Sequence, residues 1–194
     1  GNQVKGRVLV ERHLNACLDL GIYLTGINAE VAVGQWEFQC FAEETLTACD
    51  DLWVSRYLLY KMSEGLGLDA DLAPKPVRGD WNGSGCHTNF SNQKMRDVGG
   101  EDYFNRVLKS LETRHLDHIE EYGVGNEDRL TGLHETQHIS KFSWGVGDRG
   151  ASIRVPNSTK NNMWSGYLED RRPASNCDPY SVARLIIDAT APVT

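Results

Sequence analysis

The sequence predicts an α+β fold in one domain spanning residues 1–194, and three features of the residue pattern lead to this prediction. Apolar side chains recur every three or four residues in three long segments, which is typical of amphipathic helices. Shorter segments alternate apolar and polar side chains with a period of two, which is typical of strands. No internal repeat, low-complexity tract or linker divides the chain, so helices and strands are expected to share one core.

Helices are expected over residues 7–20, 44–64, 101–121 and 180–189. Gly21 follows the first of them, at the place where a helix C-cap is expected. An apolar stripe at helical spacing is typical of the face that a helix turns toward a core. The stripes are Val10, Leu14, Cys17 and Leu18 in the first helix, Leu46, Cys49, Trp53, Tyr57 and Tyr60 in the second, and Phe104, Leu108, Leu111 and Ile119 in the third.

Strands are expected in five segments of the chain. A glycine-rich stretch, residues 122–150, is expected to form loops, and a polar insert, Asn157–Ser165, separates the last two strands. The strands are expected over residues 22–31, 35–41, 84–91, 151–155 and 166–170.

Composition excludes some partners. The net charge is −7, from 20 basic and 27 acidic residues, which argues against a nucleic-acid groove but not against ATP in a local basic pocket. Five cysteines without a CxxC pair favour neither a disulfide framework nor a zinc site. The first residues show no signal-peptide pattern, and no apolar run approaches the roughly 20 residues that a membrane helix needs. A cytoplasmic protein without nucleic-acid or membrane partners is expected.

Carboxylates on adjacent predicted strands are the first candidate site. Asn28 and Glu30 share one face of the first strand, and Glu37 and Gln39 share one face of the next. A tight hairpin would bring Glu30 and Glu37 side by side, where they repel unless a cation lies between them. Oxygen ligands of this kind suit Mg²⁺ or Mn²⁺. The alternative is a solvated sheet face, which these residues taken alone favour.

A second group combines an imidazole, carboxylates and arginines. His87 lies on the polar face of its strand, although a single histidine is more often structural than a ligand. Glu169 and Arg171 alternate with Asp170 and Arg172 in an extended segment, which is unusual for a core strand. Together with other arginines in polar segments, they suggest phosphoryl transfer with metals, whereas any one arginine alone fits a surface salt bridge. Those other arginines are Arg96, Arg129, Arg149 and Arg154.

Two further patterns do not indicate a binding site. His115 and His118 are spaced as a possible metal pair on the third helix, but no acidic or cysteine partner completes it, so a solvated helix face is expected. Gly145, Gly147 and Gly150 suggest a dinucleotide loop, but the strand–turn–helix context is absent.

Five motifs in order resemble those of the eukaryotic-type glutamine synthetase family and span nearly the whole chain. They are the paired segments Asn28–Val31 and Gly34–Gln39, the segment from Pro74-Lys75-Pro76 through Gly79–Asn89, and the segments Arg129–Thr136, Asp148–Pro156 and Gly166–Pro173. The resemblance implies ATP-dependent ligation of ammonia to glutamate through γ-glutamyl phosphate, with two or more Mg²⁺ or Mn²⁺ ions. It also implies a curved antiparallel sheet with flanking helices and a homo-oligomeric ring.

The resemblance also assigns roles to individual residues. It implies that the flap glutamate Glu135 accepts a proton from ammonium, while Arg149 and Arg154 face the transferring phosphate. The implied metal ligands are Glu30, Glu37, His87 and Glu169. The implied glutamate ligands are Asn82, Gly83, Arg129 and Arg171, and the implied nucleotide ligands are Gln39, Asn89, Ser91, Arg96 and Tyr167.

The main departure from the family is an absence. Family members carry an N-terminal β-grasp domain followed by a strand with a Glu-x-Glu pair. Neither feature is found in this sequence. The first catalytic strands are therefore expected to be absent, and residues 1–194 are expected to form a partial catalytic domain. Each metal pair would then lack one protein ligand, and the isolated chain is expected to be inactive. The alternatives are a non-catalytic member of the superfamily and a ligase that joins glutamate to another amine.

Overall fold

The computed structural model describes residues 4–97 and 99–193, and the chain divides into two compact units, Gly1–Asp71 and Leu72–Thr194. Both helices and sheets are present, so the predicted α+β class is confirmed. The single partial catalytic domain over residues 1–194 stays a prediction.

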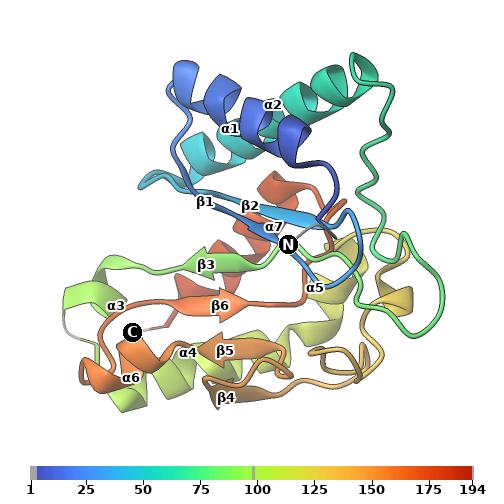
Figure 1. The fold of residues 1–194 in the computed structure, drawn as a ribbon. Helices are drawn as coiled ribbons and strands as arrows, with labels where there is room; N and C mark the ends of the chain where they lie inside the picture. Colours follow the sequence, from blue (N-terminus) through green and yellow to red (C-terminus); the bar gives the residue numbers. More distant parts are fainter. Residues whose placement is uncertain (1–3, 98, 194) are drawn as a thin grey trace. The chain divides into compact units, whose positions relative to one another are not determined.

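The first unit consists of a β-hairpin and two helices. Helices α1 (Arg7–Asp19) and α2 (Thr45–Glu64) pack against each other and against the hairpin of β1 (Leu24–Ala29) and β2 (Trp36–Cys40) (Figure 1). Gly21 follows α1 with a left-handed φ of 80°, which confirms the predicted helix end. The core of this unit is Cys17, Ile22 and Leu24 with Leu14, Phe38, Cys40 and Leu58.

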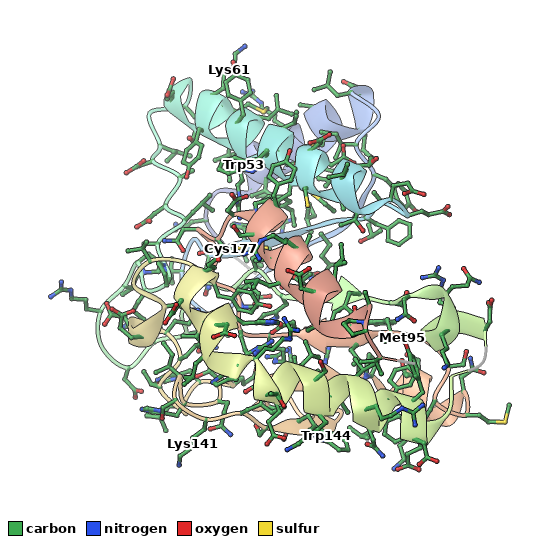
Figure 2. All side chains as sticks on the ribbon, turned by 180° about the vertical axis from the view of Figure 1, so that it is seen from behind. Trp53, Lys61, Met95, Lys141, Trp144 and Cys177 are labelled. Atoms are coloured by element: carbon green, nitrogen blue, oxygen red, sulfur yellow. The ribbon has the colours of Figure 1, made fainter. Side chains whose placement is uncertain are left out.

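The apolar stripe predicted for α2 does not face the core, so this prediction is wrong. Trp53, which Figure 2 labels, is 45% exposed and Tyr57 is 61% exposed, whereas Ser55 is fully buried. The reason is steric, because the Ser55 hydroxyl lies 3.6 Å from the Sγ atoms of both Cys17 and Cys40. Only a small side chain fits where α2 meets α1 and β2, so the larger apolar residues lie outside. Of the predicted stripe only Cys49 is buried, and Leu46 and Tyr60 are exposed as well.

The second unit has a four-stranded sheet in the order β3-β6-β5-β4. The helices α4 and α7 lie on one face of this sheet, as both views show (Figures 1 and 2). The core on this face includes Phe104, Val107, Leu108, Leu111, Ile153, Val155 and Leu168. The strands are β3 (Thr88–Phe90), β4 (Trp144–Val146), β5 (Ile153–Val155) and β6 (Leu168–Asp170), and the longer helices are α4 (Glu101–Thr113), α5 (His115–Glu121) and α7 (Pro179–Thr190).

The sheet is mixed, which corrects the predicted antiparallel arrangement. Strand β6 is antiparallel to β3 and to β5, but β4 runs parallel to β5. The segment between β4 and β5 turns back at once, because Gly147 adopts a left-handed φ of 65° and the Asp148 carboxylate accepts a hydrogen bond from the Gly150 amide. The chain therefore returns to the start of β4, and β5 runs beside β4 in the same direction.

The predicted helix over residues 101–121 is interrupted at Arg114. Its backbone leaves the helical region there, with φ −100° and ψ 14°, and the Thr113 hydroxyl donates to the Lys109 carbonyl at 2.9 Å. Short helices that the sequence did not predict also occur, namely α3 (Gln93–Asp97), α6 (Asn157–Asn161) and the 3₁₀ helix η1 (Asn126–Asp128). Within the described ranges, no helix has the length and apolar character needed to cross a membrane.

His115 and His118 are buried, which overturns their predicted solvated position. His118 lies against the Tyr122 hydroxyl at 2.9 Å and accepts from Arg172 at 3.0 Å. Arg172 pairs with Asp170 at 2.7 Å, and Tyr122 donates to the same carboxylate at 2.8 Å. The helix turns these histidines inward because the core-facing side of β6 carries an ion pair that needs polar neighbours.

We expect residues 72–194 to lose stability as the pH falls from 6.5 toward 4. Burial and the nearby Arg172 lower the pKa of His118 from 6.5 to about 4, against the opposing effect of Asp170. Between these values the unfolded chain binds a proton that the folded chain excludes, so acid favours unfolding. A shift of this size corresponds to on the order of 3 kcal/mol in the free energy of unfolding.

Urea unfolding at pH 7 and pH 5 tests this expectation. His118→Gln removes the titrating group, so its unfolding midpoint should change less between the two pH values than that of the wild type. The exposed His138 provides the matched control, and His138→Gln should keep the wild-type dependence. An equal pH dependence in all three proteins would contradict the assignment to His118.

Candidate active site

The face of the sheet opposite α4 and α7 carries a row of polar side chains. Asn89 on β3 lies opposite Glu169 on β6, and Glu169 lies opposite Arg154 on β5. Directly opposed residues of antiparallel strands share a face, so these three side chains lie together. The neighbouring residues Leu168 and Asp170 point to the core side, where both are fully buried. Alternation along β6 therefore separates the candidate site from the core.

Glu169 is the centre of this row. Its carboxylate contacts three basic side chains: Arg171 at 3.1 Å, His87 at 3.4 Å, and the Nε atom of Arg154. Burial by itself raises the pKa of Glu169, but His87 and the arginines outweigh that effect and lower the pKa to about 2. Glu169 is 5% exposed, so its negative charge is held by these partners rather than by water.

His87 is held between a donor and an acceptor. Arg129 Nη2 lies 3.2 Å from the Nε2 atom of His87 and can only donate, so Nε2 accepts and Nδ1 carries the proton that faces Glu169. Loss of solvent around the ring lowers the pKa of His87, against the raising effect of its contact with Glu169. The imidazole is therefore neutral, which is the form that binds metals.

Arg129 is buried, and its guanidinium makes two hydrogen bonds to the main chain and two to the side chains of Asn126 and His87. Its guanidinium donates to the carbonyl oxygens of Arg171 at 2.8 Å and Arg172 at 3.1 Å. Burial and the nearby Arg171 lower the pKa of Arg129 to about 10, which still leaves it charged at neutral pH. In this arrangement Arg129 supports the segment after β6, and binding a substrate carboxylate would require it to exchange these contacts.

Gly85 also shapes the site, although no role for it was predicted from the sequence. A Cβ atom at Gly85 would lie 2.4 Å from Arg129 Nη2 and 3.0 Å from His87 Nε2. Gly83 is equally constrained, since its Cβ atom would lie 2.6 Å from the Pro74 carbonyl oxygen. The glycines of this motif thus leave room for the arginine and the imidazole.

We expect Gly85→Ala to displace His87 and Arg129 and to weaken Mn²⁺ binding by about tenfold, since overpacking costs about 1–3 kcal/mol. The backbone at Gly85 is not left-handed, so the effect is steric rather than conformational. Calorimetric titration of Mn²⁺ measures it. Gly65→Ala in the other unit is the control for nonspecific effects of alanine, because its backbone is not left-handed and the nearest atom to the added Cβ would lie at an ordinary 3.6 Å. Wild-type Mn²⁺ affinity in Gly85→Ala would show that the close contact relaxes without cost.

The flap, predicted from the segment Arg129–Thr136, lies in a closed loop over residues 131–138. Thr131 and His138 pair at its base, and Glu135 lies at its tip with a left-handed φ of 59°. The Glu135 carboxylate lies 3.5 Å from Arg149 Nε, and its carbonyl accepts from Arg171 at 3.4 Å. The structure therefore brings Glu135, Arg149 and Arg171 together.

The predicted nucleotide ligands are partly grouped. Arg96 on α3 donates to the Ser91 hydroxyl at 2.9 Å, so these two are in contact. Asn89 precedes them on β3, and the Tyr167 carbonyl is bound by Thr159 at 2.9 Å. Asn82 lies half-buried in the loop before β3. Gln39 belongs to the first unit.

In the first unit the hairpin places Glu30 and Glu37 on one face as diagonal neighbours. Glu37 lies opposite Asn28, and the Glu30 amide donates to the Gln35 carbonyl at 2.9 Å. The two glutamates are therefore offset along the hairpin rather than directly opposite, and Gln39 donates to the Glu37 carboxylate. Diagonal neighbours lie about 7–8 Å apart, within reach of two long side chains that share one cation.

Both pairs fit a hard divalent cation with two protein ligands. His87 Nδ1 and Glu169 Oε1 are 3.4 Å apart, close to the roughly 3 Å between neighbouring ligands of octahedral Mg²⁺. Ligation by Nδ1 would require the ring proton to move to Nε2 and Arg129 to turn away from that nitrogen. Across the described part of the chain, no cluster of three or more His, Cys, Asp or Glu residues is placed to hold a metal. Mg²⁺ retains several waters and accepts one or two carboxylates, so two-ligand pairs suit it.

The fold and this face define an α+β protein with a carboxylate, an imidazole and several arginines gathered on one side of a sheet. A family model described as "Glutamine synthetase, catalytic domain" matches residues 3–105. The chain therefore belongs to the glutamine synthetase family.

Individual relatives agree with this assignment. The chain is 51% identical over 185 residues to a protein named glutamine synthetase cytosolic isozyme from Daucus carota, covering 95% of this chain and 52% of that protein. It is 51% identical over 188 residues to glutamine synthetase from Bradyrhizobium diazoefficiens, covering 96% and 55%, respectively. A nodule isozyme from Lupinus luteus is 52% identical over 185 residues, covering 95% and 52%. The chain thus spans about half the length of the curated relatives it matches.

Proposed function

We propose that this chain supplies the catalytic region of a glutamate–ammonia ligase, which uses ATP to convert glutamate and ammonium to glutamine, ADP and phosphate. The observation that carries this proposal is the environment of Glu169, a buried carboxylate that contacts Arg154, Arg171 and His87 on the polar face of the sheet. Such a cluster suits a site that handles a divalent cation and several anionic oxygens at once. The relatives named glutamine synthetase support the same reaction.

The proposed reaction needs an activated carboxylate, since ammonia does not displace oxide from glutamate. Arg149 and Arg154 offset negative charge on the phosphoryl group as it passes from ATP to the glutamate side chain. Bound Mg²⁺ or Mn²⁺, held by Glu30 with Glu37 and by His87 with Glu169, would add positive charge to the phosphates. Ammonia then attacks the γ-glutamyl phosphate and phosphate leaves.

The remaining residues bind and protect the reactants. Arg171 and Arg129 bind the glutamate carboxylates, and each must first exchange present contacts. Arg171 would leave Glu169 and the Glu135 carbonyl, and Arg129 would leave two main-chain carbonyls. Glu135 accepts a proton from ammonium, and the flap limits hydrolysis of the acyl phosphate by water. Asn82 and Gly83 complete the proposed glutamate site. The proposed nucleotide ligands are Gln39, Asn89, Ser91, Arg96 and Tyr167.

The whole protein is proposed to act in the cytoplasm as a homo-oligomeric ring, in line with the cytosolic isozymes among its relatives. The second candidate function is a non-catalytic member of the family. It is favoured by the contacts that already occupy Glu169 and Arg129.

A γ-glutamyl hydroxamate assay with Mg²⁺ or Mn²⁺ separates these candidates. It is run on the 194-residue chain and on the product of the complete reading frame that contains it. Activity in the longer product supports the ligase, and inactivity of both proteins while folded rejects it in favour of the non-catalytic candidate. Competition between ammonium and small amines in the active protein tests the amine-ligase alternative, which predicts preferred use of the amine.

A further inference from the structure

Two loops of the second unit face each other across an open pocket of about 700 Å³. One loop precedes β3 and contributes Asp80, and the other is the flap, which contributes His134. The pocket is lined by Lys75, Arg78, Gly79 and Asp80 from the first loop, by Thr131, Leu133 and His134 from the flap, and by Asp128. It lies beside the flap glutamate but outside the row of polar side chains on the sheet.

The flap has a firm base and a strained tip. At the base, the Ile139 amide donates to the Leu130 carbonyl at 2.9 Å. Near the tip, the Thr136 amide donates to the Leu133 carbonyl at 3.2 Å. His134 and Glu135 both have left-handed φ angles, 52° and 59°, which cost backbone energy in residues other than glycine. Contacts of the tip with its surroundings must therefore stabilise this conformation.

Those contacts run from the tip to different segments. His134 Nε2 lies 2.9 Å from the Asp80 carboxylate, whereas Glu135 contacts Arg149 through its side chain and Arg171 through its carbonyl. The loop that carries Asp80 is itself closed, because the Ser84 amide donates to the Pro74 carbonyl at 2.8 Å. Lys75 also donates to the Trp81 carbonyl within this loop. Asp80 is thus attached to a fixed framework.

We propose that Asp80 is a positioning residue: by holding His134, it keeps the flap tip in the conformation that directs Glu135 toward Arg149 and Arg171. The catalytic consequence rests on the proposed function, whereas the contact between Asp80 and His134 is independent of it. The Asp80 side chain is 96% exposed and that of His134 is 26% exposed, so water screens the pair. The contact therefore biases the flap by a few-fold and does not lock it.

The first measurement is hydrogen exchange in the 194-residue chain, which does not require activity. Asp80→Ala should raise the exchange rate of the Thr136 amide about threefold to fivefold and leave that of Ile139 unchanged. Asp128→Ala is the matched control, since Asp128 lines the same pocket without an ion pair among the described residues, and it should change neither amide. Asp80→Glu should restore most of the protection at Thr136.

The second measurement uses the product of the complete reading frame. Asp80→Ala should raise the ratio of phosphate released to hydroxamate formed about threefold to fivefold, because an open flap lets water hydrolyse the acyl phosphate. Asp128→Ala should keep the wild-type ratio.

The outcomes separate the positioning contact of Asp80 with His134 from the proposed ligase function. An unchanged Thr136 amide in Asp80→Ala, or equal changes at Thr136 and Ile139, overturns the positioning role. A changed Thr136 amide with an unchanged ratio overturns its part in the reaction. A changed Thr136 amide in a protein whose wild type makes no hydroxamate supports the contact and rejects the proposed function instead.

Discussion

Glu169→Gln is expected to lower the rate of hydroxamate formation about 100- to 1,000-fold in the product of the complete reading frame. The substitution keeps the size of the side chain and removes the negative charge that Arg154, Arg171 and His87 share. Without that charge a divalent cation loses a ligand, and two neighbouring arginines repel each other. Rates at saturating Mn²⁺ and Mn²⁺ affinity measured by calorimetry report the two effects separately.

Glu112→Gln is the matched control for this experiment. Glu112 is an exposed carboxylate on α4 that pairs with Lys109 at 2.7 Å, and an exposed pair of this kind contributes about 0–1 kcal/mol. Its removal should leave the rate and the Mn²⁺ affinity unchanged. A Glu169→Gln enzyme that keeps its rate within about threefold of the wild type would remove Glu169 from the catalytic site.

Arg172→Met is expected to destabilise residues 72–194 by about 3–5 kcal/mol. Asp170 is fully buried, and Arg172 donates to both of its carboxylate oxygens, at 2.9 Å and 2.7 Å. Removing the arginine leaves an uncompensated charge in the core, together with the two histidines that accept from it. Hydrogen exchange of the amides of Val107 to Leu111 in α4 measures the loss within this unit.

Two further variants show whether the charge causes the effect. Arg172→Met combined with Asp170→Leu removes both charges and should recover part of the stability, because an apolar pair avoids the desolvation penalty. Arg184→Met removes an exposed arginine that pairs with Glu121 at 2.7 Å, and it should have little effect. If the double variant is no more stable than Arg172→Met, the cost is one of packing and not of charge.

The sequence determined the local elements and the order of the motifs. Periodicity over 7–20 and 44–64 predicted α1 and α2 within one residue at each end, and Gly21 predicted the end of α1. Alternation predicted the two strands of the β1–β2 hairpin and placed Glu169 and Asp170 on opposite faces of β6. These features depend on neighbouring residues along the chain, so the sequence contains them directly. The motifs likewise indicated the family that the comparisons show.

Only the tertiary structure decided which faces are buried. α2 turns Ser55 inward and Trp53 outward because the space beside Cys17 and Cys40 admits only a small side chain. His118 is buried because its acceptor nitrogen meets Arg172, 54 positions away in sequence. The parallel pairing of β4 and β5 depends on the turn that joins them. Periodicity indicates that a helix or strand has two unlike faces. The partner of each face depends on contacts between residues distant in sequence, and these contacts exist only once the chain has folded.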